Sequence, residues 1–156
     1  MKRRGENAVA VVQLGDGTLG EGAPAQPDFI SHAVRVGNLV FTSGQVSALG
    51  DLDIRGKVGG DLTLEEGQKA AEICAVNCLR AIAAVADPDS IVRIIKVLGM
   101  VNVAEGFDAT PAVINGATNL LNTVVGDNGT HARSAVGMVL PFNYAVEVEL
   151  VAELRA

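Results

Sequence analysis

Arg133 stands at the start of a run of small and apolar residues that ends at Pro141. The alternation of residue types over 134–140 predicts a β-strand that is apolar on both sides, which would put the guanidinium near a buried edge or an interface. A guanidinium in such a place needs an anion, and its planar fork suits a carboxylate held by two parallel hydrogen bonds. Arg133 is therefore a candidate site for a small carboxylic acid, and an internal salt bridge to Glu147 or Glu149 is the alternative.

A segment near the C-terminus, 145–154, supplies carboxylates. Apolar residues at even positions of 145–154 alternate with glutamates, which predicts a second strand joined to that of Arg133 by a turn at 141–144. This hairpin would put the guanidinium and Glu147 on neighbouring strands. Three like charges on one face usually point to solvent, but packing of that face against a neighbouring subunit would raise the pKa of Glu147. The carboxylate could then position water or carry a proton.

A glycine follows the predicted strand 39–43 in the sequence Thr42-Ser43-Gly44-Gln45. Without a side chain, Gly44 permits close approach by a ligand or by another backbone, and a plain bulge or turn is the alternative. Another β-prone piece, 33–36, precedes it across Gly37-Asn38, which predicts a tight hairpin turn. An additional β-prone run covers 8–14.

Two helices are expected to pack on one face of a mixed sheet, which defines an α+β fold. The first begins at the capping box 63–66 and ends near Ala86, and the second runs from the N-cap pair Thr110-Pro111 to a stop at Gly126. Between them, 90–103 is apolar at even and odd positions. We therefore expect a strand covered by helices on one face and by a second copy of the protein on the other.

Length and composition suit one domain over 1–156, with a frayed start at 1–7. Apolar residues make up 49% of the chain, yet no uninterrupted apolar run approaches the roughly 20 residues of a bilayer span. We therefore expect a soluble oligomer without a membrane partner. The net charge of −6 disfavours nucleic acid because phosphates would be repelled. The chain start lacks a signal-peptide pattern, which favours the cytoplasm.

No metal and no cofactor is expected. His32 and His131 are far apart in sequence, and no Cys/His cluster has ligand spacing. Cys74 and Cys78 lie four residues apart in the first predicted helix, which favours small core residues over a redox pair. The glycines do not follow a strand and open a helix as in nucleotide-binding loops, and a Gly-Xaa-Ser-Xaa-Gly segment is missing.

An ordered set of motifs resembles one protein family. The motifs are 36–45 (Val-Gly-Asn-Leu-Val-Phe-Thr-Ser-Gly-Gln), Gly106-Phe107, Ala132-Arg133-Ser134, Leu140-Pro141 and 146–149 (Val-Glu-Val-Glu). Together they resemble the RidA/YjgF reactive intermediate deaminases, including members labelled endoribonuclease L-PSP. The resemblance covers roughly Ala33 to the C-terminus, and 131–137 looks like a divergent branch.

The resemblance implies a chorismate-mutase-like homotrimer whose sheets form a central barrel, with helices outside and sites in the clefts between subunits. It implies hydrolysis of small 2-enamine and 2-imine acids to 2-oxo acids and ammonia without a cofactor. In that case Arg133 would bind the carboxylate of a 2-imino acid and Glu147 would hold or activate water. The remaining site residues implied by the resemblance are Ser43 and Gly44 lining the cleft, Phe107 as an apolar wall, and Asn115.

Two positions depart from the family pattern. The family's common tyrosine falls at or beside Ile30, and a cysteine often found two residues after the arginine is Ala135 here. A trimeric carboxylate-binding or regulatory protein without turnover is therefore the second hypothesis. Endoribonuclease activity, suggested by the family label alone, is the third.

Overall fold

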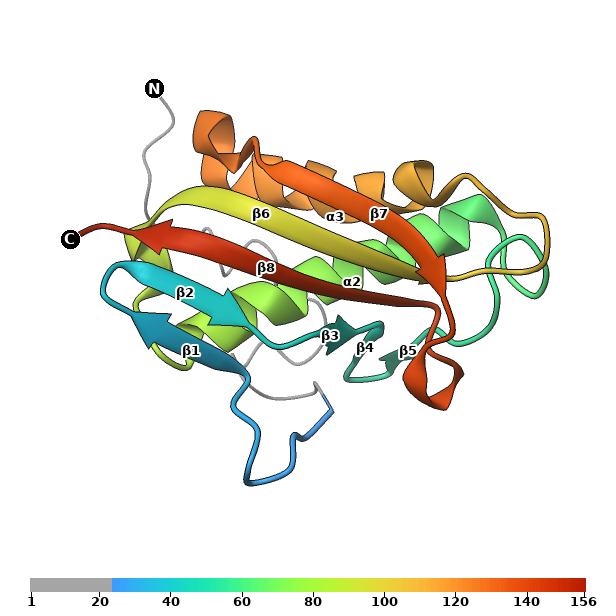
Figure 1. The fold of residues 1–156 in the computed structure, drawn as a ribbon, viewed down its shortest axis with the longest axis horizontal. Helices are drawn as coiled ribbons and strands as arrows, with labels where there is room; N and C mark the ends of the chain where they lie inside the picture. The colour runs from blue at the N-terminus through green and yellow to red at the C-terminus, as the bar shows by residue number, and fades with distance from the viewer. Residues whose placement is uncertain (1–23) are drawn as a thin grey trace.

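Residues 24–156 are described by a computed structural model, and they form a mixed sheet with two helices on one face (Figure 1). The expected strand at 8–14 and the expected frayed start at 1–7 lie outside these residues. The six-stranded sheet has the order β1-β2-β8-β6-β7, with β3 also paired to β8. Its strands are β1 (Ala33–Val36), β2 (Leu39–Thr42), β3 (Gln45–Val46), β6 (Ile91–Asn102), β7 (Ala132–Met138) and β8 (Val146–Leu154).

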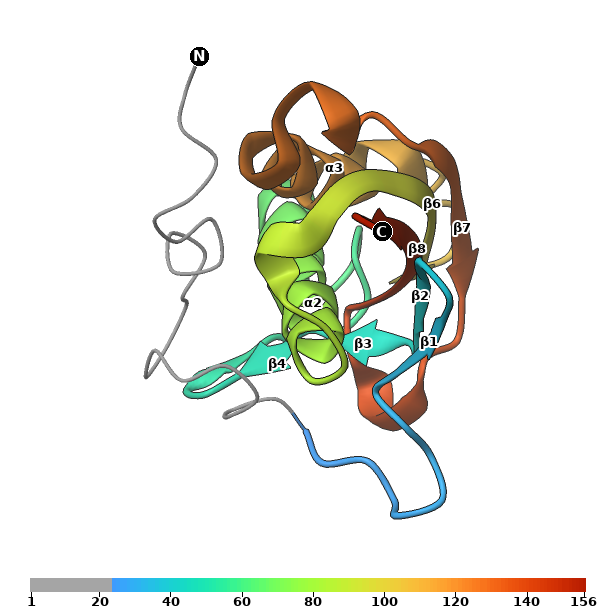
Figure 2. The same cartoon turned by 90° about the vertical axis from the view of Figure 1, so that its left-hand side faces the viewer.

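Helices α2 (Leu64–Ala83) and α3 (Thr110–Val125) pack against the same face of the sheet, as expected (Figure 2). The predicted capping box of α2 is confirmed: the Glu66 amide donates to Thr63 Oγ1 at 3.2 Å, and the Thr63 amide donates to Glu66 Oε2 at 2.7 Å. Neither described helix is both long and apolar enough to cross a membrane. Cys74 and Cys78 are free thiols on the buried side of α2 that faces β8, which confirms that they are core residues.

Helix α3 begins one residue earlier than predicted. The N-cap residue is Ala109, and Thr110 is the first helical residue. Its hydroxyl does not cap the helix but donates to the carbonyl oxygen of Ala135 on β7 at 3.0 Å, because the helix start lies against that strand. The predicted end is confirmed, since Gly126 closes α3 with a φ of 73°.

Strand β6 is apolar at even and odd positions partly because its pairing with β8 is irregular, which the sequence pattern does not reveal. Two register shifts interrupt its pairing with β8, between Ile91 and Arg93 and between Ile94 and Lys96. In a regular strand, side chains three residues apart point to opposite faces. The two shifts instead bring Ile91, Ile94 and Val97 to the same face, in the core beneath the helices. On the other face of β6, Lys96 is exposed, Leu98 is half-buried and Met100 is buried in the single chain, so the expected cover by a second copy stays a prediction.

The predicted hairpin between the last two strands is wrong. Strand β7 pairs in parallel with β6, whereas β8 pairs antiparallel with the other edge of β6. Because α3 connects β6 to β7, these elements form a β-α-β crossover that places β7 beside β6 and in the same direction. The chain then passes through the 3₁₀ turn Pro141–Asn143 to reach the far side of β6.

The sheet face opposite the helices carries exposed apolar side chains. They come from both ends of the strand order and are Val34, Val36, Phe41, Val136 and Met138. A short separate hairpin, β4 (Ala48–Leu49) and β5 (Leu52–Asp53), follows β3 in the chain.

Candidate functional site

Arg133 is fixed against helix α3 by three hydrogen bonds. Its Nη1 donates to Asn115 Oδ1 at 2.9 Å and to Thr118 Oγ1 at 3.0 Å, and its Nη2 donates to the carbonyl oxygen of Pro111 at 3.3 Å. The side chain is therefore held in one place at the edge strand β7. We call Arg133, Asn115 and Thr118 the cation half-site.

The three groups that accept hydrogen bonds from Arg133 are all neutral. Between residues 24 and 156 the ion pairs join Arg55 to Asp53 and Lys69 to Glu72, so the alternative of an internal salt bridge from Arg133 to Glu147 or Glu149 is wrong. Asn115 Oδ1 accepts from the guanidinium, which leaves the amide nitrogen of Asn115 as a donor. The half-site thus offers positive charge and N–H donors, a combination that suits a carboxylate.

Glu147 is partly buried on β8 next to the break between β2 and β3. Burial, with a smaller contribution from the nearby charge of Glu149, raises the pKa of Glu147. Gly44 lies directly over the carboxylate, since a Cβ at position 44 would come within 2.6 Å of Glu147 Oε1. The lack of a side chain at Gly44 therefore makes room for the Glu147 carboxylate, and the group that approaches this glycine is a side chain. Close approach by a ligand stays a prediction.

Ser43 belongs to the same break in the sheet. Its hydroxyl donates to the carbonyl oxygen of Ser31 at 2.6 Å, and its amide donates to His32 O at 2.8 Å. The adjacent Thr42 Oγ1 accepts from the amide of Leu150 at 3.0 Å and bridges the irregular pairing with β8. We call Glu147, Gly44 and Ser43 the carboxylate half-site.

The two half-sites lie on opposite faces of the sheet within one chain. Arg133 pairs with Val97, which in turn pairs with Leu150, and both of these apolar residues face the helices. Glu147 pairs with Met100, three positions along β8 from Leu150, so pleating turns it to the other face. A single chain therefore does not bring the guanidinium and the Glu147 carboxylate together.

Phe107 lies in the segment between β6 and α3. Its ring packs on Gly59, where a Cβ would come within 2.5 Å of a ring carbon. The structure thus brings Asn115 to Arg133 and Gly44 to Glu147, whereas Phe107 belongs to neither half-site.

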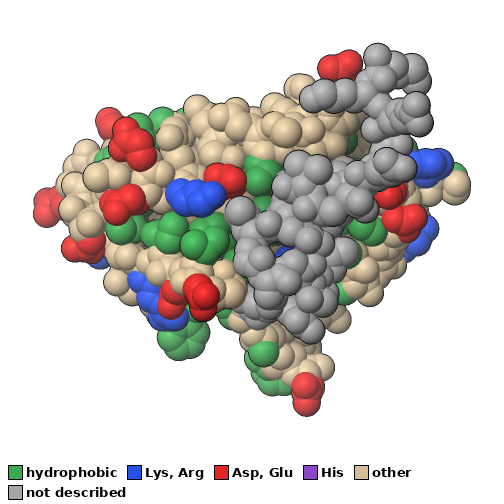
Figure 3. Space-filling view, turned by 180° about the vertical axis from the view of Figure 1, so that it is seen from behind, with side chains coloured by type: hydrophobic (Ala, Val, Ile, Leu, Met, Phe, Trp, Pro, Cys, Tyr) green, Lys and Arg blue, Asp and Glu red, His purple; other side chains and the backbone are tan. Residues whose placement is uncertain are grey.

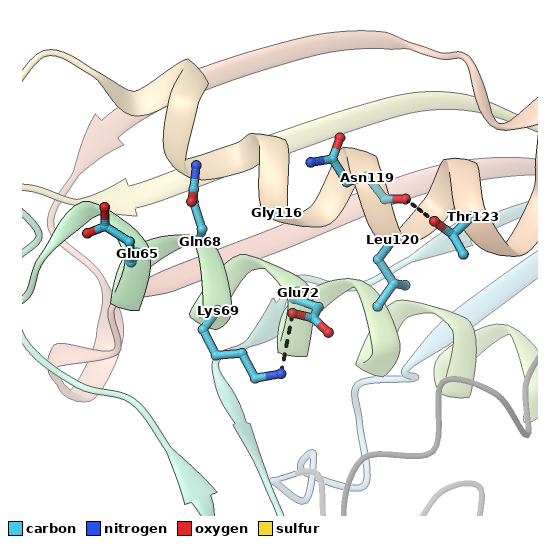
Figure 4. A pocket seen from close by; sticks show the side chains of 8 residues that line it. All are labelled: Glu65, Gln68, Lys69, Glu72, Gly116, Asn119, Leu120 and Thr123. Carbon is cyan, nitrogen blue, oxygen red and sulfur yellow. Dashed lines mark hydrogen bonds and ion pairs between the residues drawn. The ribbon is translucent and has the colours of Figure 1, made fainter.

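Two surface hollows lie away from Arg133. One, of about 540 Å³, separates α2 from α3 and is lined by Gln68, Lys69, Glu72 and Asn119 among others; Lys69 and Glu72 pair with each other there (Figure 4). The other, of about 310 Å³, lies on the uncovered sheet face and includes Ser134 and Glu149. Arg133 of the cation half-site lines neither hollow and lies on the edge strand β7.

Thr118 and His131 are site neighbours that sequence reasoning missed. Thr118 follows Asn115 by three residues on α3, a spacing that puts both side chains on one helix face. This spacing is the feature of the sequence from which Thr118 could have been predicted as a neighbour of Asn115. His131 was considered only as a metal ligand, and its ring nitrogens lie 3.1 Å from Thr118 Oγ1 and 2.6 Å from Gly129 O.

The described surface adds two further observations. Seen from the helix side, acidic side chains are spread over the described part of the face, with basic ones between them (Figure 3). No group of three or more His, Cys, Asp or Glu side chains placed to hold a metal occurs within 24–156.

Fold and half-sites together define a mixed α+β protein with a fixed guanidinium at a sheet edge, and this guanidinium has no carboxylate partner within 24–156. The sequence profile of the family described as "YjgF/chorismate mutase-like, putative endoribonuclease" matches residues 11–154. The chain therefore belongs to the YjgF family.

Similar proteins support this placement. Protein TCP17 of Trypanosoma cruzi is 37% identical, with 97% of this chain and 96% of that protein covered. The structure of Atu1372 from Agrobacterium tumefaciens, a protein of unknown function, is 42% identical over 81% of this chain and 82% of that one, with a TM-score of 0.77. A putative endoribonuclease from Shewanella oneidensis MR-1 is 31% identical over 88% of this chain and 92% of that chain, with a TM-score of 0.79.

Proposed function

We propose that this protein hydrolyses small 2-imine and 2-enamine acids to 2-oxo acids and ammonia, at sites that two copies of the chain build together. The observation that carries the proposal is the guanidinium of Arg133, which neutral groups hold in place and which has no carboxylate partner within 24–156. A partly buried positive charge without a counterion is stabilised by an anionic ligand. A substrate carboxylate supplies that anion.

Glu147 supplies the base. A carboxylate whose pKa is raised by burial accepts a proton more readily near neutral pH than an exposed one. As water attacks C2 of the imine, its proton passes to Glu147 and the C–O bond forms. That proton then passes to the imine nitrogen, which gives a carbinolamine. Glu147 takes the proton of the new hydroxyl group and passes it to the nitrogen, so the C=O bond forms as the C–N bond breaks, and ammonia leaves with the 2-oxo acid behind. No cofactor takes part in these steps.

The geometry of the half-sites supports an assembly of several copies. Arg133 and Glu147 lie on opposite faces of one sheet, so a complete site needs the cation half-site of one copy and the carboxylate half-site of another. The exposed apolar side chains on the face opposite the helices give the copies a surface to bury. We propose the homotrimer with a central barrel that the family resemblance implies, with Phe107 and Ser43 near its clefts.

The proposal is tested in a coupled assay. A threonine or serine dehydratase releases the unstable imine, and the appearance of 2-oxo acid is followed with and without this protein. We expect faster product formation with the wild type and no gain with Arg133→Ala, because loss of a paired charge-assisted contact weakens binding by roughly 100-fold. Arg35→Ala, an exposed arginine at the opposite edge of the sheet, is the matched control. No acceleration at equimolar wild-type protein contradicts the proposal.

A carboxylate-binding protein without turnover is the second candidate. It is favoured by Ile30 and Ala135, which stand where the family commonly has a tyrosine and a cysteine. This candidate predicts thermal stabilisation by 2-oxobutanoate that Arg133→Ala abolishes, with no product formed in the coupled assay. Ribonuclease activity, which appears in the family description and in the name of one relative, predicts RNA cleavage that follows the protein's own elution peak.

A further inference from the structure

A chain of hydrogen bonds runs behind the guanidinium of Arg133. Nη1 lies 3.0 Å from Thr118 Oγ1, Thr118 Oγ1 lies 3.1 Å from Nε2 of His131, and Nδ1 of His131 lies 2.6 Å from the carbonyl oxygen of Gly129. These residues come from β7, α3 and the segment between them. The chain connects the cation half-site to the backbone at the end of α3.

The chemistry of the end groups gives this chain a direction. A carbonyl oxygen can only accept, so the short contact to Gly129 requires the proton of the neutral imidazole on Nδ1. Nε2 is then an acceptor, and the hydroxyl of Thr118 donates to it. Because the single hydroxyl proton of Thr118 is donated to His131, its oxygen is left to accept the hydrogen bond from Nη1 of Arg133.

We infer that His131 and Thr118 are positioning residues that hold the Arg133 guanidinium for the substrate carboxylate. The inference rests on the proposed function. Asn115 and Thr118 occupy both N–H groups of Nη1, and Pro111 O occupies one of Nη2. Within residues 24–156, Nε–H and the second N–H of Nη2 stay available for a ligand. By fixing the hydroxyl of Thr118, His131 fixes the orientation of the guanidinium that presents these donors.

The first test separates positioning from folding. Thr118→Val replaces the hydroxyl by a methyl group of similar shape, and we expect KM for the imine and Kd for 2-oxobutanoate to rise about tenfold, the equivalent of one hydrogen bond of ~1.4 kcal/mol. The value of kcat should change much less, because Glu147 is untouched. Thr118→Ser, which keeps the hydroxyl, should stay close to the wild type. Thr123→Val is the matched control, since Thr123 lies on the same helix and donates only to Asn119 O.

The second test addresses His131 through two amide replacements. The amide of His131→Asn can take the place of Nδ1–H and keep the bond to Gly129, but it offers Thr118 no acceptor, so KM should rise as in Thr118→Val. The longer His131→Gln can place its amide oxygen near the position of Nε2 and should keep more of the affinity. Nitrogen NMR of the wild-type protein should show that the neutral imidazole of His131 is protonated on Nδ1 and unprotonated on Nε2.

The outcomes separate this inference from the proposed function. If Arg133→Ala loses 2-oxobutanoate binding while Thr118→Val and His131→Asn keep wild-type KM and Kd, the positioning role is overturned and the proposed function stands. A neutral ring protonated on Nε2 also overturns it. If Arg133→Ala binds 2-oxobutanoate as the wild type does, the anion site itself is wrong, and the inference falls with it. Melting temperatures of all variants show whether a loss of affinity reflects unfolding.

Discussion

Mixing two inactive variants gives the sharpest test of a site shared between copies. Arg133→Ala removes the cation half-site and leaves Glu147 intact, whereas Glu147→Gln does the reverse. Because the two side chains lie on opposite faces of one sheet, a complete site would take Arg133 from one chain and Glu147 from the next. In mixed oligomers, some interfaces therefore combine the intact half-site of each variant.

The expected recovery follows from counting interfaces. If equal amounts of the two variants are unfolded, mixed and refolded, each position of a ring holds either variant with equal chance. An active interface needs one particular variant on each side, so about one quarter of the interfaces should be active in a closed ring. The coupled dehydratase assay should then show about one quarter of the wild-type gain.

The control is each variant refolded alone, which should give no gain. Size-exclusion chromatography and mass measurement establish that the mixed sample contains oligomers of both variants. No recovery in such mixed oligomers would refute the reasoning, since it would mean that Arg133 and Glu147 act within one chain or not in one site.

Three further predictions concern single residues. Gly44→Ala should lower kcat by roughly 10- to 100-fold through displacement of the carboxylate of Glu147, yet shift the melting temperature little, because the contacted atoms end a flexible side chain. Glu147→Gln should raise the melting temperature at pH 7, since a raised folded-state pKa means that ionisation of Glu147 destabilises the fold; the difference should vanish as the pH falls below the ordinary carboxyl pKa, which thermal melts across pH measure. Burial raises the pKa of Cys78 to about 12, so its thiol should react with a disulfide reagent at pH 8 only as the protein unfolds, and rapid native-state labelling would contradict this.

Local signals predicted the helices well. The capping box at Thr63 and the glycine at 126 each act within one turn of helix, so neighbouring residues decide the outcome. The pairing of strands was less accessible. Pro141 and the short turn after it are compatible with a hairpin between β7 and β8, and equally with a connection that carries the chain across β6. The crossover through α3 places β7 on one side of β6, which leaves the other side for β8.

The candidate site was predicted residue by residue but not in its arrangement. Arg133 and Glu147 could be singled out by residue type, position and family resemblance. Their separation by the sheet could not, because the face of each side chain depends on strand register, which is set by contacts far apart in sequence. Thr118 was missed for a similar reason, since its role comes from the packing of α3 on β7.

Both half-sites lie where the regularity of the sheet ends. Arg133 is on the edge strand β7, so α3 can fix its guanidinium from one side while the other side stays open to a ligand. Glu147 is on the interior strand β8, but it lies opposite the break between β2 and β3, where Gly44 leaves space above the carboxylate. A regular interior strand would cover such a group with a neighbouring side chain and leave no room for water beside it. The edge at β7 and the break are therefore places where a charged group can be held by the fold and still reach a substrate.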